Sequence, residues 1–134
     1  MFVDAAAIVA ILSNETEAER CAQAVMKASA PFTSAIAVWE AAMALARPEK
    51  LAIPVARSAE IVDRFLEERA IALRELPPAS EATSLSVEAA ARFRNNAVRL
   101  NMADCFHYAC ARYYAVPILS TANEFRLTDL ETVP

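Results

Sequence analysis

Glycine is absent from this 134-residue chain. Average usage of about 7% would place roughly nine glycines in a protein of this length. Glycine normally serves turns and helix ends where φ is positive, because it lacks a Cβ atom. Asparagine tolerates that conformation better than most residues, so we expect it to be used there instead. The candidates are Asn14, Asn95, Asn96 and Asn123.

Long hydrophobic runs and an excess of positive charge are also lacking. No apolar run approaches the roughly 20 residues that span a bilayer, and we expect neither a signal peptide nor membrane association. The net charge of −4 argues mildly against a binder that relies on overall positive charge for nucleic acid. The 57% of hydrophobic residues argues against disorder. We therefore expect a single folded domain over residues 1–134.

Cysteine occurs three times, at Cys21, Cys105 and Cys110. An odd number without a zinc-type spacing is typical of reduced thiols in a cytoplasmic protein.

Short apolar segments alternate with helical patterns along the chain. Expected strands cover residues 1–4, 30–33, 71–76, 116–121 and 128–133. Expected helices cover residues 5–12, 15–29, 34–47, 55–69, about 80–94 and 101–114. Ser34 is a candidate cap for the third helix, and Ser80, Thr83 and Ser84 are candidate caps for the fifth. This α/β order predicts a central, mostly parallel sheet with helices on both faces.

Four acidic residues each follow an apolar segment: Asp4, Glu40, Asp104 and Glu124. A carboxylate in apolar surroundings is costly to desolvate unless it is paired or binds a metal. Ligands of parallel sheets gather at the carboxyl ends of the strands, and this order can bring all four acids there. The pattern therefore favours a site for a hard cation such as Mg²⁺ or Mn²⁺.

Each acid also has a plainer interpretation. Asp4 could cap the following helix, and Asp104 could interact with a helix dipole. Glu40 could lie on a solvated helix face, and Glu124 could lie in a surface loop. His107, three residues after Asp104, lies on the same helix face. It could be a base or a ligand, but we favour packing or a place at the rim.

Basic residues surround Asp104 in the sequence and are candidates for a nucleic-acid-binding rim around an acidic site. They are Arg92, Arg94, Arg99 and Arg112.

Several motifs occur in an order that resembles the PIN-domain ribonucleases, specifically the VapC-like toxins of type II toxin–antitoxin systems. The resemblance covers nearly the whole chain. It rests on Phe2–Leu12, Thr33-Ser34 with Glu40, Leu100–Phe106 with Tyr108-Ala109, Pro117–Leu119, Asn123–Phe125 and Thr128–Leu130.

The resemblance implies a three-layer α/β/α domain that hydrolyses RNA phosphodiester bonds with Mg²⁺ or Mn²⁺. Asp4, Glu40 and Asp104 match three acidic motif positions, and Glu124 matches the fourth by residue type. Asn123 and Asp129 are second choices for that fourth position. The resemblance also implies a homodimer and neutralisation by a VapB-like antitoxin.

The chain departs from the family motifs at three small residues. Ala6 replaces the usual serine or threonine, while Ala103 and Ala122 replace glycines. An alternative is therefore a catalytically weak or inactive PIN-fold binding module that only pairs with an antitoxin. A third hypothesis is a simplified, glycine-free scaffold, which is compatible with both the nuclease and the binding module. Metal-dependent RNA cleavage that Asp4→Asn abolishes would separate the first two.

Overall fold

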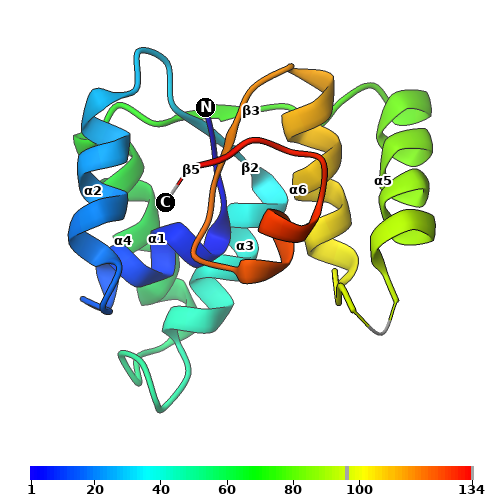
Figure 1. Cartoon of the computed structure of the whole chain (residues 1–134). Coiled ribbons are helices and arrows are strands. Elements are labelled where there is room, and N and C mark those ends of the chain that lie inside the picture. The colour runs from blue at the N-terminus through cyan, green and yellow to red at the C-terminus, as the bar shows by residue number, and fades with distance from the viewer. Residues whose placement is uncertain (96, 134) are drawn as a thin grey trace.

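A computed structural model describes residues 1–95 and 97–133 of the chain (Figure 1). Within these residues five short strands form one sheet in the order β3-β2-β1-β4-β5. The strands are β1 (Phe2–Val3), β2 (Phe32–Ser34), β3 (Ala72–Arg74), β4 (Ile118–Leu119) and β5 (Thr132–Val133). Every strand pair of the sheet is parallel. The predicted α/β class with a parallel sheet is confirmed.

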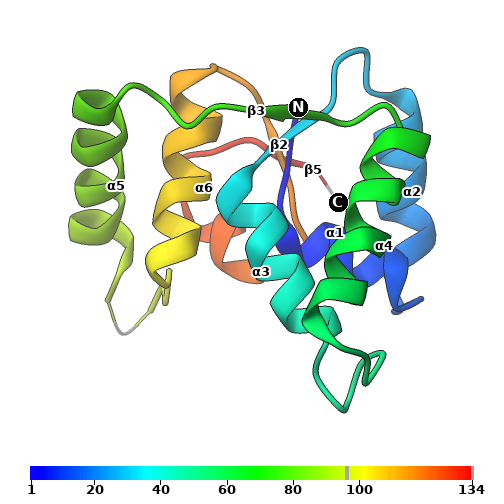
Figure 2. The same cartoon turned by 180° about the vertical axis from the view of Figure 1, so that it is seen from behind.

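Helices connect the strands and cover both faces of the sheet. They are α1 (Ala5–Leu12), α2 (Ala18–Lys27), α3 (Ala35–Leu45), α4 (Val55–Glu68), α5 (Ala79–Phe93), α6 (Met102–Tyr113) and the 3₁₀ helix η1 (Asn123–Leu127). Helices α5 and α6 pack side by side at one end of the molecule, and α2 and α4 lie at the other (Figure 1). The view from behind shows α3 and α4 in front of the strands (Figure 2). None of the helices in the described residues is long and apolar enough to cross a membrane.

The central strands carry several of the largest fully buried side chains. Phe2, Phe32 and Ile118 are 0–1% exposed, and the Phe2 and Phe32 rings meet edge to face with centroids 5.6 Å apart. Phe2 lies opposite both Phe32 and Ile118 in the parallel register. Burial of each such side chain stabilises the fold by about 1.5–3 kcal/mol. This packing fixes the carboxyl ends of β1 and β4. Asp4 and Ser120 are the residues that directly follow these two strands in the chain.

The predicted caps of the fifth helix are wrong, although its start agrees with the expected position to within one residue. Helix α5 begins at Ala79, directly after Pro78, and its N-cap residue makes no side-chain capping bond. The hydroxyl of Thr83 donates to the Ala79 carbonyl one turn back, and Ser80 bonds to Glu81. The candidate caps Ser80, Thr83 and Ser84 therefore lie inside the helix, because Pro78 already ends the preceding extended segment.

Positive φ angles occur at Asn14, Ala52, Ala70 and Ala115 in the described part of the chain. The expectation for Asn14 is confirmed, and those for Asn95 and Asn123 are wrong. The Asn95 side chain instead accepts bonds from the amides of Ala97 and Val98, and Asn123 opens η1. Asn96 lies outside the described residues.

Three of these positions directly follow the C-cap of a helix. After α4, the Ala70 amide bonds to the Glu67 carbonyl and the Ile71 amide to the Leu66 carbonyl. The same pair of bonds closes α6 at Ala115 and α1 at Asn14. This is the Schellman arrangement, which requires a left-handed residue after the C-cap. At Ala70 and Ala115 the place directly after the C-cap, and not the residue type, therefore determined the positive φ.

Candidate active site

Asp4 lies at the carboxyl end of β1 and is 2% exposed. It occupies the N-cap position of α1, but its side chain makes no capping bond. One carboxylate oxygen instead accepts a 2.5 Å hydrogen bond from the Ser120 hydroxyl, and the other lies 2.7 Å from Nδ1 of His107. The side chain is thus directed toward β4 and α6, and the capping interpretation does not describe its contacts.

Ser120 reaches Asp4 because of the strand register. Val3 of β1 pairs with Leu119 of β4, so the next residue of each strand lies beside the other. Ser120 is fully buried and also accepts a bond from the Ala122 amide. Its hydroxyl therefore holds Asp4 in place from the neighbouring strand.

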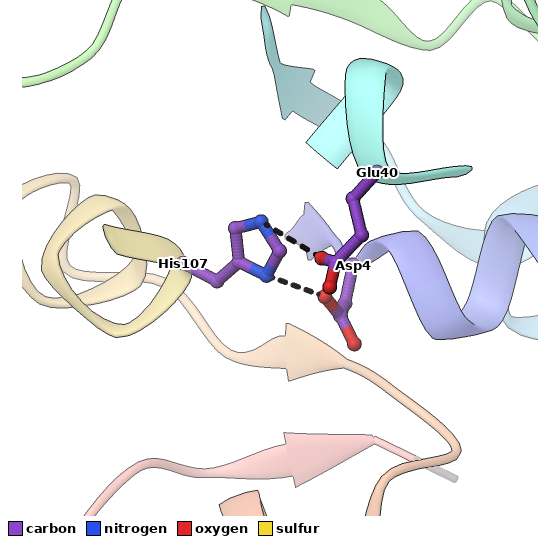
Figure 3. Close-up of side chains that lie close together, drawn as sticks. All are labelled: Asp4, Glu40 and His107. Atoms are coloured by element: carbon purple, nitrogen blue, oxygen red, sulfur yellow. Dashed lines mark ion pairs between the residues drawn. The ribbon is translucent and has the colours of Figure 1, made fainter. Parts of the chain in front are cut away.

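His107 comes from α6 and lies between two carboxylates (Figure 3). Its Nδ1 faces Asp4, and its Nε2 lies 3.7 Å from a carboxylate oxygen of Glu40 on α3. The imidazole is 0% exposed, yet neither ring nitrogen makes a hydrogen bond of good geometry with a residue that the structure describes. Asp4, Glu40 and His107 each offer one ligand atom within 4.8 Å of the others. Three elements thus bring a compact donor set together beneath the surface.

Asp104 lies in the first turn of α6 and has a structural bond as well. Its carboxylate accepts a 2.7 Å hydrogen bond from the Asn101 amide, and the Asn101 side chain accepts one from the Asp104 amide. This capping box confirms that Asp104 contributes to the start of the helix. The carboxylate also lines the cavity described next, so the two roles are compatible.

A cavity of about 420 Å³ opens over these groups. Asp4, Glu40, Asp104 and Glu124 all line it, although they come from β1, α3, α6 and η1. Ala6 lines it too, without the hydroxyl found there in related motifs. The four acids predicted from sequence are therefore neighbours in space. Asn123, a second choice, is exposed and is not among the described residues that line the cavity.

Asp129, the other second choice, is engaged elsewhere. It accepts a 2.8 Å hydrogen bond from the Tyr108 hydroxyl and pairs with Arg92 at 2.9 Å. Burial alone would raise the pKa of Asp129, but these two partners lower it overall. Arg92 also pairs with Glu88. This group lies between α5, α6 and the chain end and stabilises their packing.

The basic rim differs from the one expected. Of the predicted arginines, Arg99 lines the acidic cavity, and Arg94 lines an adjoining hollow that shares Arg99 and Asn101. Arg112 lines a different hollow beside Asp129. Arg47 and Lys50, which follow α3, line the acidic cavity although the sequence analysis did not single them out. The rim therefore draws on two separate parts of the chain.

The titration of the buried groups reflects their crowding. Burial would raise the pKa of Asp4, but the charge of His107 and the Ser120 bond outweigh burial and lower it. Burial would lower the pKa of His107, but the surrounding carboxylates raise it, Asp4 most strongly. Burial and neighbouring carboxylates raise the pKa values of Glu40 and Asp104. The site thus concentrates negative charge that a bound cation would relieve.

The residues fit a divalent metal ion on chemical grounds. Several carboxylates converge on one water-accessible cavity, and carboxylate oxygens suit Mg²⁺ and Mn²⁺. The buried imidazole without a well-formed hydrogen bond is a further donor at the same place. The sequence pattern gives no sign of Ser120 and does not indicate that His107 contacts Asp4, because only the strand register and the position of α6 reveal these contacts.

Comparison with known proteins gives consistent matches. The PIN-domain family profile matches residues 1–129. A VapC ribonuclease of Rhizobium meliloti is 30% identical, with 96% of this chain and 98% of the relative aligned. A ribonuclease VapC of Mycolicibacterium smegmatis is 31% identical over 99% of both chains. The crystal structure of Mycobacterium tuberculosis VapC20, described as a sarcin–ricin loop cleaving toxin, superposes with a TM-score of 0.74 at 14% identity, over 99% of this chain and 98% of that one.

Proposed function

Because the chain belongs to the PIN-domain family and is a VapC-like member of it, we propose that it is a metal-dependent endoribonuclease toxin. It hydrolyses RNA phosphodiester bonds and is neutralised by a cognate antitoxin. The observation that carries the proposal is the convergence of Asp4, Glu40, Asp104 and Glu124 from four separate segments on one cavity.

The four carboxylates hold Mg²⁺ or Mn²⁺ in this proposal. Such a cation supplies Lewis acidity, activating water for attack on phosphorus and neutralising charge that grows on the phosphate oxygens. Asp4 and Asp104 are the principal ligands, and Glu40 and Glu124 complete the site. Ser120 fixes the orientation of Asp4 through its 2.5 Å hydrogen bond.

Basic side chains at the mouth of the cavity bind the RNA backbone. Arg47, Lys50 and Arg99 line the same cavity as the acids and can contact phosphates on either side of the scissile bond. Lys50 also pairs with Glu15 across the rim, which holds its ammonium group near the opening. Local positive charge beside the acids thus compensates for the overall charge of −4.

The proposed protein partners are an antitoxin and a second copy of the chain. A VapB-like antitoxin can insert an arginine into the cavity, because a guanidinium fork matches paired carboxylates. The chain forms a homodimer and acts in the cytoplasm as a single domain, and no membrane is involved.

The test is cleavage of a panel of structured RNAs by the purified protein, with Mg²⁺ or Mn²⁺ and with a chelator. We expect cleavage that requires the metal and falls at least about 100-fold in Asp4→Asn, since removal of one charged ligand disables the centre. Asp63→Asn is the matched control, because Asp63 is an exposed aspartate of α4 outside the cavity.

An inactive binding module is the second candidate, favoured by the missing hydroxyl at Ala6 in the cavity wall. Absence of cleavage by the folded protein, with retained binding of an antitoxin peptide, would support that module and contradict the nuclease.

A further inference from the structure

We propose that His107 is a direct ligand of the metal, so that the centre is a mixed nitrogen and oxygen site that selects Mn²⁺ over Mg²⁺. This inference rests on the metal site of the proposed function. It goes beyond the acidic motif, which supplies oxygen ligands only.

The position of the imidazole supports a role as a ligand. His107 is 0% exposed, and the two nitrogens point toward Asp4 and Glu40 (Figure 3). Its Nδ1 lies 2.7 Å from Asp4 and its Nε2 lies 3.7 Å from Glu40. Ligand atoms about 2.1 Å from a common ion lie at most about 4.2 Å apart. Asp4, Glu40 and His107 each offer one ligand atom, and these three atoms lie within 4.8 Å of one another, close to that limit.

The Nε2 atom of the ring has unmet hydrogen-bonding capacity. Nδ1 is paired with Asp4 at 2.7 Å, but Nε2 has no hydrogen-bond partner among the described residues, and the carboxylate oxygen of Glu40 lies 3.7 Å from it. A buried polar group without a partner costs about 1–3 kcal/mol. Ligation of an ion held by Asp4 and Glu40 would give one nitrogen the partner that it lacks.

Neighbouring side chains hold the imidazole ring of His107 in place. Phe2 contacts the imidazole with ring centroids 5.6 Å apart, and the neighbouring helical residues Cys105, Tyr108 and Cys110 are buried. Helix α6 also contacts both β1 and α3, which carry Asp4 and Glu40. The ring is therefore held in one place by packing, as a ligand needs to be.

The chemistry of the donor then determines the choice of ion. Mg²⁺ prefers oxygen ligands and keeps its waters, whereas imidazole suits transition metals. A nitrogen donor therefore adds more to the binding of Mn²⁺ than to that of Mg²⁺.

The test is pulsed electron paramagnetic resonance of the Mn²⁺-loaded full chain, prepared without a histidine tag. His107 is the only histidine, so nitrogen coupling to Mn²⁺ can be assigned by ¹⁵N-histidine labelling alone. We expect ¹⁴N modulation in the unlabelled protein, its replacement by ¹⁵N modulation after labelling, and its loss in His107→Gln.

Equilibrium titrations give a second readout that does not depend on activity. The ratio of Mn²⁺ to Mg²⁺ affinity should fall at least about tenfold in His107→Gln. Tyr108→Phe is the matched control on the same helix, because its hydroxyl contacts Asp129 outside the cavity, and its ratio should stay unchanged. Circular dichroism of both variants verifies that they fold.

Two other outcomes would overturn the inference. Mn²⁺ bound tightly in an Asp4-dependent manner, but without nitrogen coupling, would make His107 only a neighbour of oxygen ligands and leave the proposed function intact. No Mn²⁺ or Mg²⁺ binding in any variant would overturn both the inference and the metal-dependent function.

Discussion

The residue that orients Asp4 comes from an unexpected place. Related motifs have a hydroxyl two positions after the first acid, where this chain has Ala6. In the structure Ser120, which follows the neighbouring strand β4 of the sheet, donates a hydrogen bond to Asp4 instead. A hydrogen bond to a charged group contributes about 1.5–3 kcal/mol. The buried Asp4 carboxylate therefore has a hydroxyl donor even though position 6 is alanine.

Protonation of His107 should make the stability of the metal-free protein depend on pH. The pKa of His107 is raised in the folded chain, so its stabilising contribution is complete below the unfolded value of about 6.5. That contribution is lost as the pH rises through the raised pKa. The pKa of Asp4 is lowered, so its contribution is present above about 3.8 and is lost as the pH falls through the lowered value.

Urea unfolding from about pH 5 to 9 in the presence of chelator measures this dependence. We expect the free energy of unfolding to decline on the alkaline side in the wild type and to be flatter in His107→Gln. Since the chain has no other histidine, equal slopes in both proteins would contradict the assignment.

At the scale of elements, the absence of glycine places alanine in the left-handed conformation at two helix ends. Ala70 and Ala115 both have φ of 51° directly after the C-caps of α4 and α6. A left-handed conformation costs a residue with a Cβ atom about 1–2 kcal/mol. The helices still end there, because the closing hydrogen bonds and the strands that follow fix the direction of the chain.

Glycine at these positions should stabilise the protein. We expect Ala70→Gly and Ala115→Gly each to raise the free energy of unfolding by about 1 kcal/mol, since glycine adopts positive φ without strain. Both alanines are exposed, so loss of the methyl group costs little packing. Ala91→Gly, at an exposed position in the last turn of α5 with helical φ, is the control and should destabilise by up to about 1 kcal/mol. Denaturant midpoints give the comparison, and destabilisation by all three changes would argue against helix-end strain.

At the scale of the whole molecule, the fold places opposite charges next to each other. The chain carries 17 acidic and 13 basic residues. The acids at the floor of one cavity and Arg47, Lys50 and Arg99 in its lining create a local field that the net charge does not describe. A metal and a phosphate backbone can therefore be attracted to adjacent parts of one site.

Metal binding should stabilise the whole fold by linkage. A free Mn²⁺ concentration about 100 times the dissociation constant adds about 2.7 kcal/mol, or roughly 10 °C in Tm for a chain of this size. Thermal unfolding of the wild type and of Asp4→Asn, with Mn²⁺ and with chelator, checks this. The variant should show no comparable shift, and an equal shift in both would indicate binding outside the cavity.

Much of the fold was accessible from local sequence. The alternation of apolar segments with helical patterns predicted the elements and their parallel sheet, because buried strands and amphipathic helices have different periods. The Ser34 cap was also predicted, since the Ser34 side chain accepts from the amide of Ala37, three residues away. The absence of a side-chain cap at α5 was not predicted, because three hydroxyl residues near Pro78 offered equivalent caps.

The sequence by itself determined which chemistry the chain could perform, because the acidic residues and the motifs around them are fixed by composition and order. Only the tertiary structure decided the assembly of the site. The Val3–Leu119 register put Ser120 on Asp4, the packing of α6 put His107 between two carboxylates, and the salt bridge to Arg92 removed Asp129 from the candidates near the cavity. These contacts join residues far apart in the chain, and local patterns carry no information about which distant side chains will meet.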